Sequence, residues 1–303
     1  MTRFASLLLA LTPLLLAGCC GNGTRAAAVY TGPTQTLSQV VADINANNQK
    51  LPTLWATHNY EADVVDEKHH RHHVAGSGKL LYQGSRQMRL TGDSVVGLVF
   101  EIGSNAQTYW LKLGPEAGNT MWWGTWADFA QADPDSLNIP IRPDMVLDVL
   151  GIGTINTNFS QLPAPVMRFD GVADAYVFTW IGKLPDRWVG LREVYYDRKT
   201  KRPSRVVVYD LNGRIVMRGD LVQYRQVRLE NIPAAQWPWI AGNYVLAFPD
   251  SGSRIVFTLD QALLNTTTEG FDIKVPNQAS FRMPPPDQSG VDRVVRIGQR
   301  SAD

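Results

Sequence analysis

The stretch KLLYQGSRQMRLTGDSVVGLVFEIGSNAQTYWLKL, residues 79–113, decides the fold class. Its apolar and polar residues alternate, and the alternating runs are separated by turn residues at 84–85, 92–93 and 103–105. Alternation with a period of two, interrupted by Gly, Asn, Asp and Ser, is typical of antiparallel strands joined by tight turns. The stretch therefore predicts a β-meander, with strands at 79–83, 87–91, 96–102 and 108–113.

The same pattern continues on both sides of this meander. A strand begins near Leu54, and Asp210-Leu211-Asn212-Gly213 has the composition of a hairpin turn. We expect further strands at 120–126, 176–181, 191–197, 205–210, 215–224, 244–247, 254–258 and 271–275. So many strands joined by short turns predict a large curved antiparallel sheet.

Two segments have helical patterns instead. Thr36 and Gln39 form a capping-box pattern, and the four apolar residues of the helix that follows, at 37, 40, 41 and 44, share one face. Pro143 and Gly151 bracket a second, shorter helix at 143–150. The fold class is thus mainly β with a few helices, which we expect on the concave side of the sheet.

The N-terminus carries a different kind of pattern. Arg3 precedes an apolar run, Leu7–Leu16, that ends in the sequence LAGC at 16–19. This arrangement is typical of a bacterial lipoprotein signal, and the run is too short to span a bilayer. We expect cleavage after residue 18, so that Cys19 becomes the first residue and carries a diacylglyceryl group and a further acyl chain.

These patterns predict four regions in the chain. They are a signal peptide at 1–18, a small and polar flexible tether at 19–34, a single domain at 35–280 and a weakly ordered tail at 281–303. Loss of the signal leaves 285 residues, enough for one large domain.

Charge and cysteine content exclude several classes of protein. Lys and Arg number 29 against 28 for Asp and Glu, so nucleic-acid binding has no electrostatic basis. Cys19 and Cys20 are the two cysteines, and both lie at the signal junction. The domain therefore has no disulfide, thiol nucleophile or thiolate metal site. No later segment is long and apolar enough to span a bilayer.

In the order of its elements the chain resembles the outer-membrane lipoprotein-sorting family, which comprises the periplasmic lipoprotein carrier and its membrane-anchored receptor. The resemblance spans about residues 36–280. It rests on the helix at 37–47, the strand near Leu54, Gly78-Lys79-Leu80-Leu81-Tyr82, Arg86–Leu90, Tyr109-Trp110, Trp122–Trp126, the hairpin at 210–214 and the closing Phe271–Pro276. It implies a half-open barrel covered by helices, around an apolar cavity that holds acyl chains.

The resemblance also implies which residues line that cavity. They are the inward-facing strand residues and the apolar face of the first helix: Leu37, Val41, Ile44, Leu81, Met88, Leu98, Phe100, Trp110, Trp122 and Phe178. The basic residue followed by proline, which helps to latch the lid of the carrier, has no counterpart, because Gly84 and Ser85 stand there and Arg86 follows. No latch residue is therefore implied. The lipid anchor agrees with the receptor type.

Four of the five histidines form the cluster HHRHH at 69–73. A strand or a helix would bring some of them to one face, where imidazole nitrogens bind zinc or copper. The candidate metal ligands are His69, His70, His72 and His73. The alternative is a solvated hairpin tip, because the preceding residues 66–68 are charged. We favour the tip, since a loop rarely has the surrounding groups that fix metal ligands.

Catalytic motifs are weak or missing in the sequence. There is no G-x-S-x-G elbow, and His58 is the only histidine outside the cluster. The glycines at 76–78 and 151–153 lack the full phosphate-loop pattern. We therefore predict no enzyme activity, no catalytic residue and no cofactor.

The sequence leaves three functions open. The first is a membrane-anchored envelope lipoprotein that binds a lipid, or the acyl chains of another lipoprotein, in carriage or sorting. The second is a structural or interaction lipoprotein with a filled core and an envelope protein partner, and the third is a metal-binding envelope protein. Cys20, where Asp would favour inner-membrane retention, makes the periplasmic face of the outer membrane the favoured location.

Overall fold

The computed structural model describes residues 30–65, 69–84, 86–115, 118–131, 143–228, 232–263 and 276–297. The chain divides into two compact units, Met1–Pro33 and Thr34–Asp303. Cys19, the signal peptide and most of the tether lie outside the described residues, as does the strand predicted at 271–275. All the elements named below belong to the second unit.

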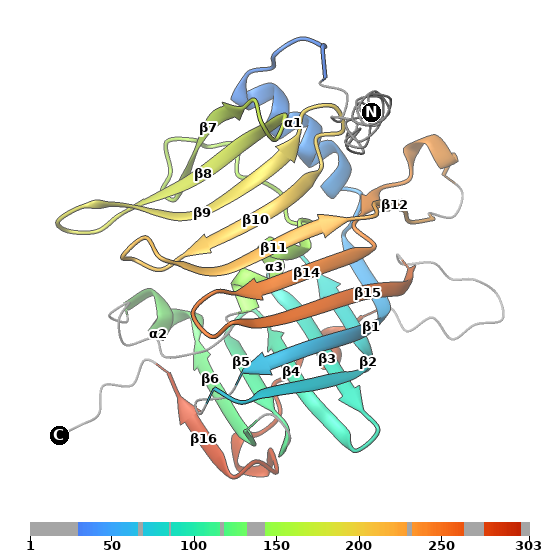
Figure 1. Cartoon of the computed structure of the whole chain (residues 1–303), viewed down its shortest axis with the longest axis vertical. Helices are drawn as coiled ribbons and strands as arrows, with labels where there is room; N and C mark the ends of the chain where they lie inside the picture. Colours follow the sequence, from blue (N-terminus) through green and yellow to red (C-terminus); the bar gives the residue numbers. More distant parts are fainter. Residues whose placement is uncertain are drawn as a thin grey trace, which may run out of the picture. The chain divides into compact units, whose positions relative to one another are not determined.

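One sheet of 14 strands forms most of this unit (Figure 1). Its order is β16-β6-β5-β4-β3-β2-β1-β15-β14-β11-β10-β9-β8-β7. The strands are β1 Thr53–Val65, β2 Arg71–Gln83, β3 Gln87–Ser94, β4 Gly97–Ser104, β5 Thr108–Leu113, β6 Thr120–Thr125, β7 Ala164–Asp170, β8 Ala175–Lys183, β9 Trp188–Asp197, β10 Pro203–Tyr209, β11 Ile215–Val222, β14 Asn243–Phe248, β15 Ser253–Leu263 and β16 Arg293–Arg296. A second sheet pairs β12 Arg225–Gln226 with β13 Trp239–Ile240.

The large sheet is curved and open, as the sequence predicts. Its neighbouring strands are antiparallel except for β16, which runs parallel to β6. β16 and β7 end the sheet and are not paired with each other. The sequence patterns did not predict β7, whose residues carry Pro165 and no clear alternation.

Among the described residues, three α-helices and three short 3₁₀ turns accompany the sheet. They are α1 Leu37–Asn48, α2 Trp126–Gln131, α3 Pro143–Leu150, η3 Ala234–Gln236, η4 Gln278–Phe281 and η5 Pro286–Gln288. The capping box of α1 is present: the Thr36 hydroxyl accepts from the Gln39 backbone N–H, and the Gln39 side chain accepts from that of Thr36. Within the residues described, no helix has the length and apolarity needed to cross a membrane.

Strand alternation places the core on one face of the sheet. In β5, Tyr109 and Leu111 belong to the main apolar cluster, whereas Trp110 between them points to the opposite face. We call the side that carries this cluster, to which α3 also contributes, the concave face. Its apolar side chains come from strands throughout the sheet, from β5 to β8.

Residues 281–297, which belong to the region predicted as a weakly ordered tail, contact the rest of the domain. Phe281 is 1% exposed, and its carbonyl accepts a hydrogen bond from Asn105 Nδ2 at 3.1 Å. Further on, β16 forms a parallel ladder with β6. Burial of an aromatic ring and pairing with an otherwise free strand edge order this segment, although its composition is rich in proline.

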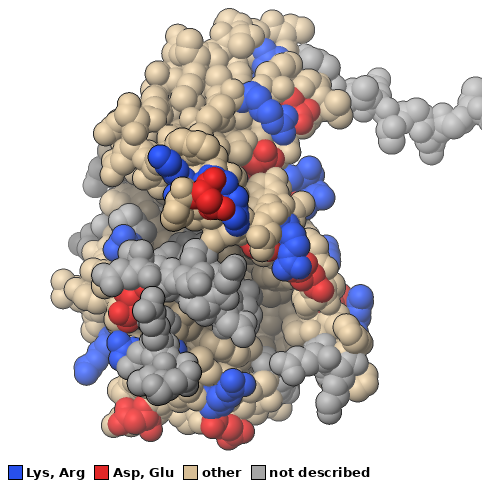
Figure 2. All heavy atoms as spheres, turned by 90° about the vertical axis from the view of Figure 1, so that its left-hand side faces the viewer, with Lys and Arg blue, Asp and Glu red and all other residues tan. Residues whose placement is uncertain are grey.

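Charges on the surface are mixed in sign. Figure 2 shows small groups in which basic and acidic side chains lie side by side, without an extended patch of one sign on that face. Arg187 pairs with Asp186, and Arg214 with Asp210, both at 2.9 Å. This distribution agrees with the near-neutral composition.

Candidate functional site

The helix α3 occupies the concave side of the sheet. It contacts β4 and β5 in one half of the sheet and β10 and β11 in the other. Val146, Val149 and Leu150 are at most 8% exposed and share one helical face. α3 therefore fills the space between the two halves of the sheet, where the resemblance implies an apolar cavity.

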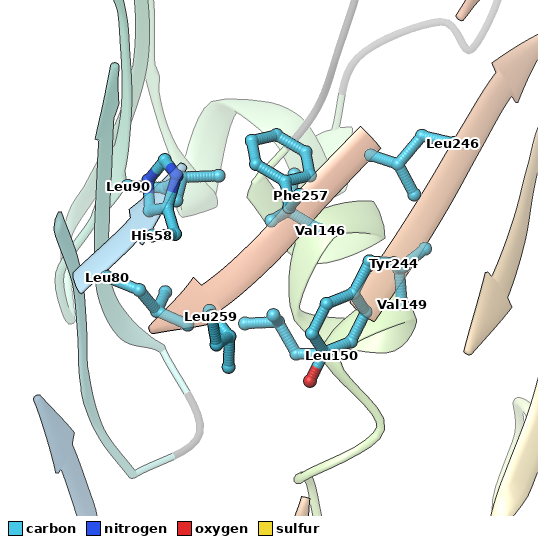
Figure 3. A pocket seen from close by; sticks show the side chains of 10 residues that line it. All are labelled: His58, Leu80, Leu90, Val146, Val149, Leu150, Tyr244, Leu246, Phe257 and Leu259. Atoms are coloured by element: carbon cyan, nitrogen blue, oxygen red, sulfur yellow. The ribbon is translucent and has the colours of Figure 1, made fainter. Parts of the chain in front are cut away.

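A small cavity remains beside α3 (Figure 3). Its volume is about 20 Å³, and its wall is apolar. The residues that line it are His58, Leu80, Leu90, Val146, Val149, Leu150, Tyr244, Leu246, Phe257 and Leu259. Such a volume holds about one water molecule, so an acyl chain does not fit while α3 is in place.

A glycine in β11 allows α3 to approach the sheet closely. A Cβ placed on Gly219 would lie 2.9 Å from Val149 Cγ1, closer than real side-chain contacts. At the end of α3, Gly151 adopts a φ of +66°, the left-handed conformation common after a helix C-terminus. This is the position at which the sequence predicts the end of the helix.

An ion pair joins α3 to β9. The Asp148 carboxylate contacts Nη1 of Arg192, and both side chains keep about a quarter of their surface exposed, 25% and 28%. The Arg192 guanidinium lies 4.3 Å from the ring centroid of Trp180 on β8. Its buried Nε has no hydrogen-bond partner among the described residues. Arg192 is thus a cation on the concave face, held between an acidic and an aromatic side chain.

Three asparagines of α1 hold the chain segments next to it. Asn45 exchanges two hydrogen bonds with the backbone of Ile155, at 2.9 and 2.8 Å. Asn47 does the same with Trp239, and Asn48 donates to the carbonyls of Gly151 and Gly153. The loop that follows α3 is therefore fixed to α1, whereas the described contacts of α3 itself include apolar packing and the Asp148–Arg192 ion pair.

His58 lies fully buried on β1 beside the cavity. Its Nε2 lies 2.9 Å from the carbonyl oxygen of Thr91, so Nε2 carries the proton and donates it. Its Nδ1 has no hydrogen-bond partner among the described residues. Burial lowers the pKa of His58, and the hydrogen bond to Thr91 opposes this only in part. The ring is therefore neutral near pH 7.

The structure brings seven of the ten predicted lining residues to the main apolar cluster. Five are buried in it and two, Leu37 and Trp122, pack against it; the five are Val41, Ile44, Met88, Phe100 and Phe178. Trp110 is buried on the opposite face, where its Nε1 donates to Glu101 at 2.9 Å. Leu81 lies between Leu80 and Tyr82 of the cluster and so points away, and Leu98 is partly exposed at the β3–β4 hairpin.

None of these ten residues is among those that line the cavity. The sequence analysis did not single out the apolar face of α3 as part of the site. The helical spacing of 146, 149 and 150 nevertheless indicates such a face. In Lys79–Gln83 two leucines are adjacent, so alternation alone does not show which of them faces inward. In the structure Leu80 faces the main apolar cluster. For β14 and β15 the strands were predicted, but their inward faces were not assigned.

The histidine cluster lies at the β1–β2 hairpin. His69, His70, His72 and His73 are exposed, and His73 Nδ1 is 3.1 Å from Asp63 Oδ1 across the ladder. Asp66 and Glu67, whose carboxylates could add oxygen ligands to a metal site, lie outside the described residues. Within the described residues, no group of three His, Cys, Asp or Glu side chains is arranged to hold a metal ion. Metal binding here stays the less favoured alternative to a solvated hairpin tip.

Comparison with known proteins gives structural similarity alone. No family model matches the chain, and no curated protein matches it. A lipoprotein-sorting domain from Vibrio parahaemolyticus is 13% identical with a TM-score of 0.46, over 77% of this chain and 94% of that one. A LolA superfamily protein from Nitrosomonas europaea is 10% identical with a TM-score of 0.47, over 78% and 96%. A DUF1329 family protein from Desulfovibrio piger is 9% identical with a TM-score of 0.44, over 82% and 100%. At these identities and TM-scores the similarity does not indicate what the chain does, so its function has to be inferred from its own residues.

Proposed function

We propose that the concave face binds an apolar ligand, a lipid or the acyl chains of another lipoprotein, and that α3 gives up its place when the ligand enters. The observation that carries the proposal is the packing of α3. A short helix with three buried apolar side chains lies between two halves of an open sheet, beside an apolar cavity. A ligand of similar apolarity can replace those contacts.

The free energy lost when α3 leaves the core is similar in size to the free energy gained when an acyl chain is buried in its place. Removing Val146, Val149 and Leu150 from the core costs roughly 5–9 kcal/mol, at about 1.5–3 kcal/mol for each side chain. Burying an acyl chain of about twelve methylenes gains on the order of 10 kcal/mol. The partly exposed Asp148–Arg192 pair adds about 0–1 kcal/mol to the cost. Such a near balance lets a ligand both enter and leave, as a carrier or receptor requires.

The proposal includes the location of the protein. Lipidation of Cys19 would hold the chain on a membrane of the cell envelope, and Cys20 favours the periplasmic face of the outer membrane. The tether between Cys19 and α1 would let the domain move relative to the membrane. In this role the protein binds and transfers its ligand without breaking bonds.

The filled core is the observation that favours a second candidate, a structural envelope lipoprotein. A scaffold needs no movable helix, and its interior would remain closed in every state. The two functions therefore differ in whether α3 leaves the core.

An experiment on the protein without residues 1–20 separates them. This form keeps the compact unit Thr34–Asp303 and lacks the acylation site and both cysteines. We expect organic extraction and mass spectrometry of the purified protein to yield co-purified lipid, and a fluorescent apolar probe to bind with about one site per chain. A protein that carries no lipid and binds no probe at any accessible concentration would support the scaffold instead.

A further inference from the structure

We infer that Arg192 binds the anionic head of the ligand, so that the ligand is an amphiphile with a carboxylate or phosphate at the end of its apolar tail. This inference rests on the proposed function and adds the chemical class of the ligand. The cation, its present partner and its surroundings all lie on the concave face.

Strand register fixes the direction of the Arg192 side chain. In β9, Val194 and Tyr196 belong to the main apolar cluster, and Arg192 is the next residue in the same alternation. Across the ladder Arg192 is paired with Trp180 on one side and Val208 on the other, both in the same cluster. A basic side chain in this position points toward the ligand space rather than toward bulk solvent.

Asp148 is the partner of Arg192 while α3 is in place. Because Asp148 belongs to α3, displacement of the helix would carry this carboxylate away from the guanidinium. Arg192 would then remain beside an aromatic ring and aliphatic side chains without an anion, which is unfavourable in surroundings of low polarity. A carboxylate or phosphate of the ligand would form the ion pair with Arg192 again. In the ligand-free protein, Asp148 thus occupies the position of the ligand head group.

The geometry of the guanidinium suits this role. Arginine offers five N–H donors in a planar fork that matches carboxylate and phosphate oxygens. Stacking over Trp180 holds the plane, and the Nε donor is free of partners among the described residues. About 28% of the side chain is exposed, so a charged head can reach it without full loss of water.

Three ligands with the same tail test the inference: dodecanoate, dodecyl phosphate and dodecan-1-ol, each below its micelle concentration. Binding to the protein without residues 1–20 is measured by displacement of a fluorescent apolar probe. We expect at least one of the two anions to bind roughly tenfold more tightly than the alcohol, since hydrogen bonds to charged groups are the stronger ones. The preference should decrease with added salt.

Variants then assign the preference to Arg192. Arg192→Gln should lose the preference for the anion and keep binding of dodecan-1-ol, whereas Arg192→Lys should retain a preference. Arg205→Gln is the matched control, because Arg205 pairs with Asp220 at 2.7 Å, is 39% exposed, and alternates with core residues so that it points to the convex face. If Arg192→Gln does not fold, two other measurements still test the inference. They are the salt dependence of the anion preference in the wild-type protein and the anion preference of Arg192→Lys.

The outcomes separate this inference from the proposed function. Equal binding of all three ligands to the wild-type protein would overturn the role of Arg192 and leave apolar binding intact. An anion preference that survives in a folded Arg192→Gln variant would also overturn it. Failure of all three ligands to bind would overturn the proposed function, and the inference with it.

Discussion

Val149 of α3 lies against Gly219 of β11 so closely that a Cβ on the glycine would be 2.9 Å from Val149 Cγ1. The absence of a side chain at 219 therefore determines how closely α3 packs against the sheet. We predict that Gly219→Ala lowers the free energy of unfolding by about 1–2 kcal/mol, because overpacking displaces the helix. Urea unfolding measures this change, and binding of an apolar probe should become tighter at the same time.

Gly190→Ala is the control for this prediction. A Cβ at Gly190 on β9 would meet Thr179 Cγ2 at 3.9 Å, an ordinary contact, so we expect little change in stability or binding. Equal effects of the two substitutions would show that α3 does not depend on the space at Gly219.

The second prediction concerns the link between α1 and the loop after α3. Asn45 is 6% exposed and makes two hydrogen bonds with the backbone of Ile155. Asn45→Leu leaves a buried N–H and a buried C=O without partners, so the free energy of unfolding should fall by roughly 2–4 kcal/mol. Asn59→Leu, which removes an exposed hydrogen bond to Asp260, should change it by less than about 0.5 kcal/mol. Similar losses for both variants would argue against a structural link.

Acid sensitivity provides the third prediction. Burial lowers the pKa of His58 in the folded protein below its ordinary value of 6.5. Above pH 6.5 the ring is neutral in both states and adds no pH dependence. As the pH falls below 6.5, the unfolded chain binds the proton first, so stability decreases by up to about 1.4 kcal/mol per pH unit until the folded-state pKa is reached.

The variant His58→Gln isolates this contribution. Glutamine can still donate to the Thr91 carbonyl but does not titrate. Urea unfolding between pH 8 and pH 5 should therefore show a smaller loss of stability for the variant than for the wild type. Identical pH profiles would mean that His58 takes up its proton in the folded protein as readily as in the unfolded chain.

The fourth prediction concerns the C-terminal segment. Phe281 is 1% exposed, and Phe281→Ala should cost about 3–4 kcal/mol and make residues 276–297 sensitive to protease. Because Phe281 is buried outside the main apolar cluster to which α3 contributes, probe binding by the folded variant should be unchanged. Val172→Ala, at a fully exposed position, is the control and should have no measurable effect on either property.

Much of the fold was predictable because it depends on local patterns. Alternation and turn residues give most strands, and Pro143 and Gly151 give the bounds of α3. The capping box likewise gives the start of α1. The C-terminal segment was not predictable in the same way, because its order comes from Phe281 and from pairing with β6, which is distant in sequence.

The candidate site was harder to predict for a physical reason. A strand residue lies on one of two faces, and a doubled apolar pair such as Leu80-Leu81 fits both. Trp110 could likewise not be assigned to a face from the sequence. A large aromatic residue suggests the main core, but Trp110 is buried on the opposite face beside Glu101. The close approach of Val149 to Gly219 and the pairing of Asp148 with Arg192 depend on tertiary packing that no local pattern encodes.

A reversible cross-link between α3 and β11 tests the central claim most directly. Val149 and Gly219 are close enough for a disulfide between Val149→Cys and Gly219→Cys, and the protein without residues 1–20 has no other cysteine. Binding of the fluorescent apolar probe is measured with the cross-link oxidised and then reduced. We predict that oxidation abolishes binding and that reduction restores it, because the ligand takes the place of α3. Equal binding in both states would show that α3 does not move and would contradict the account.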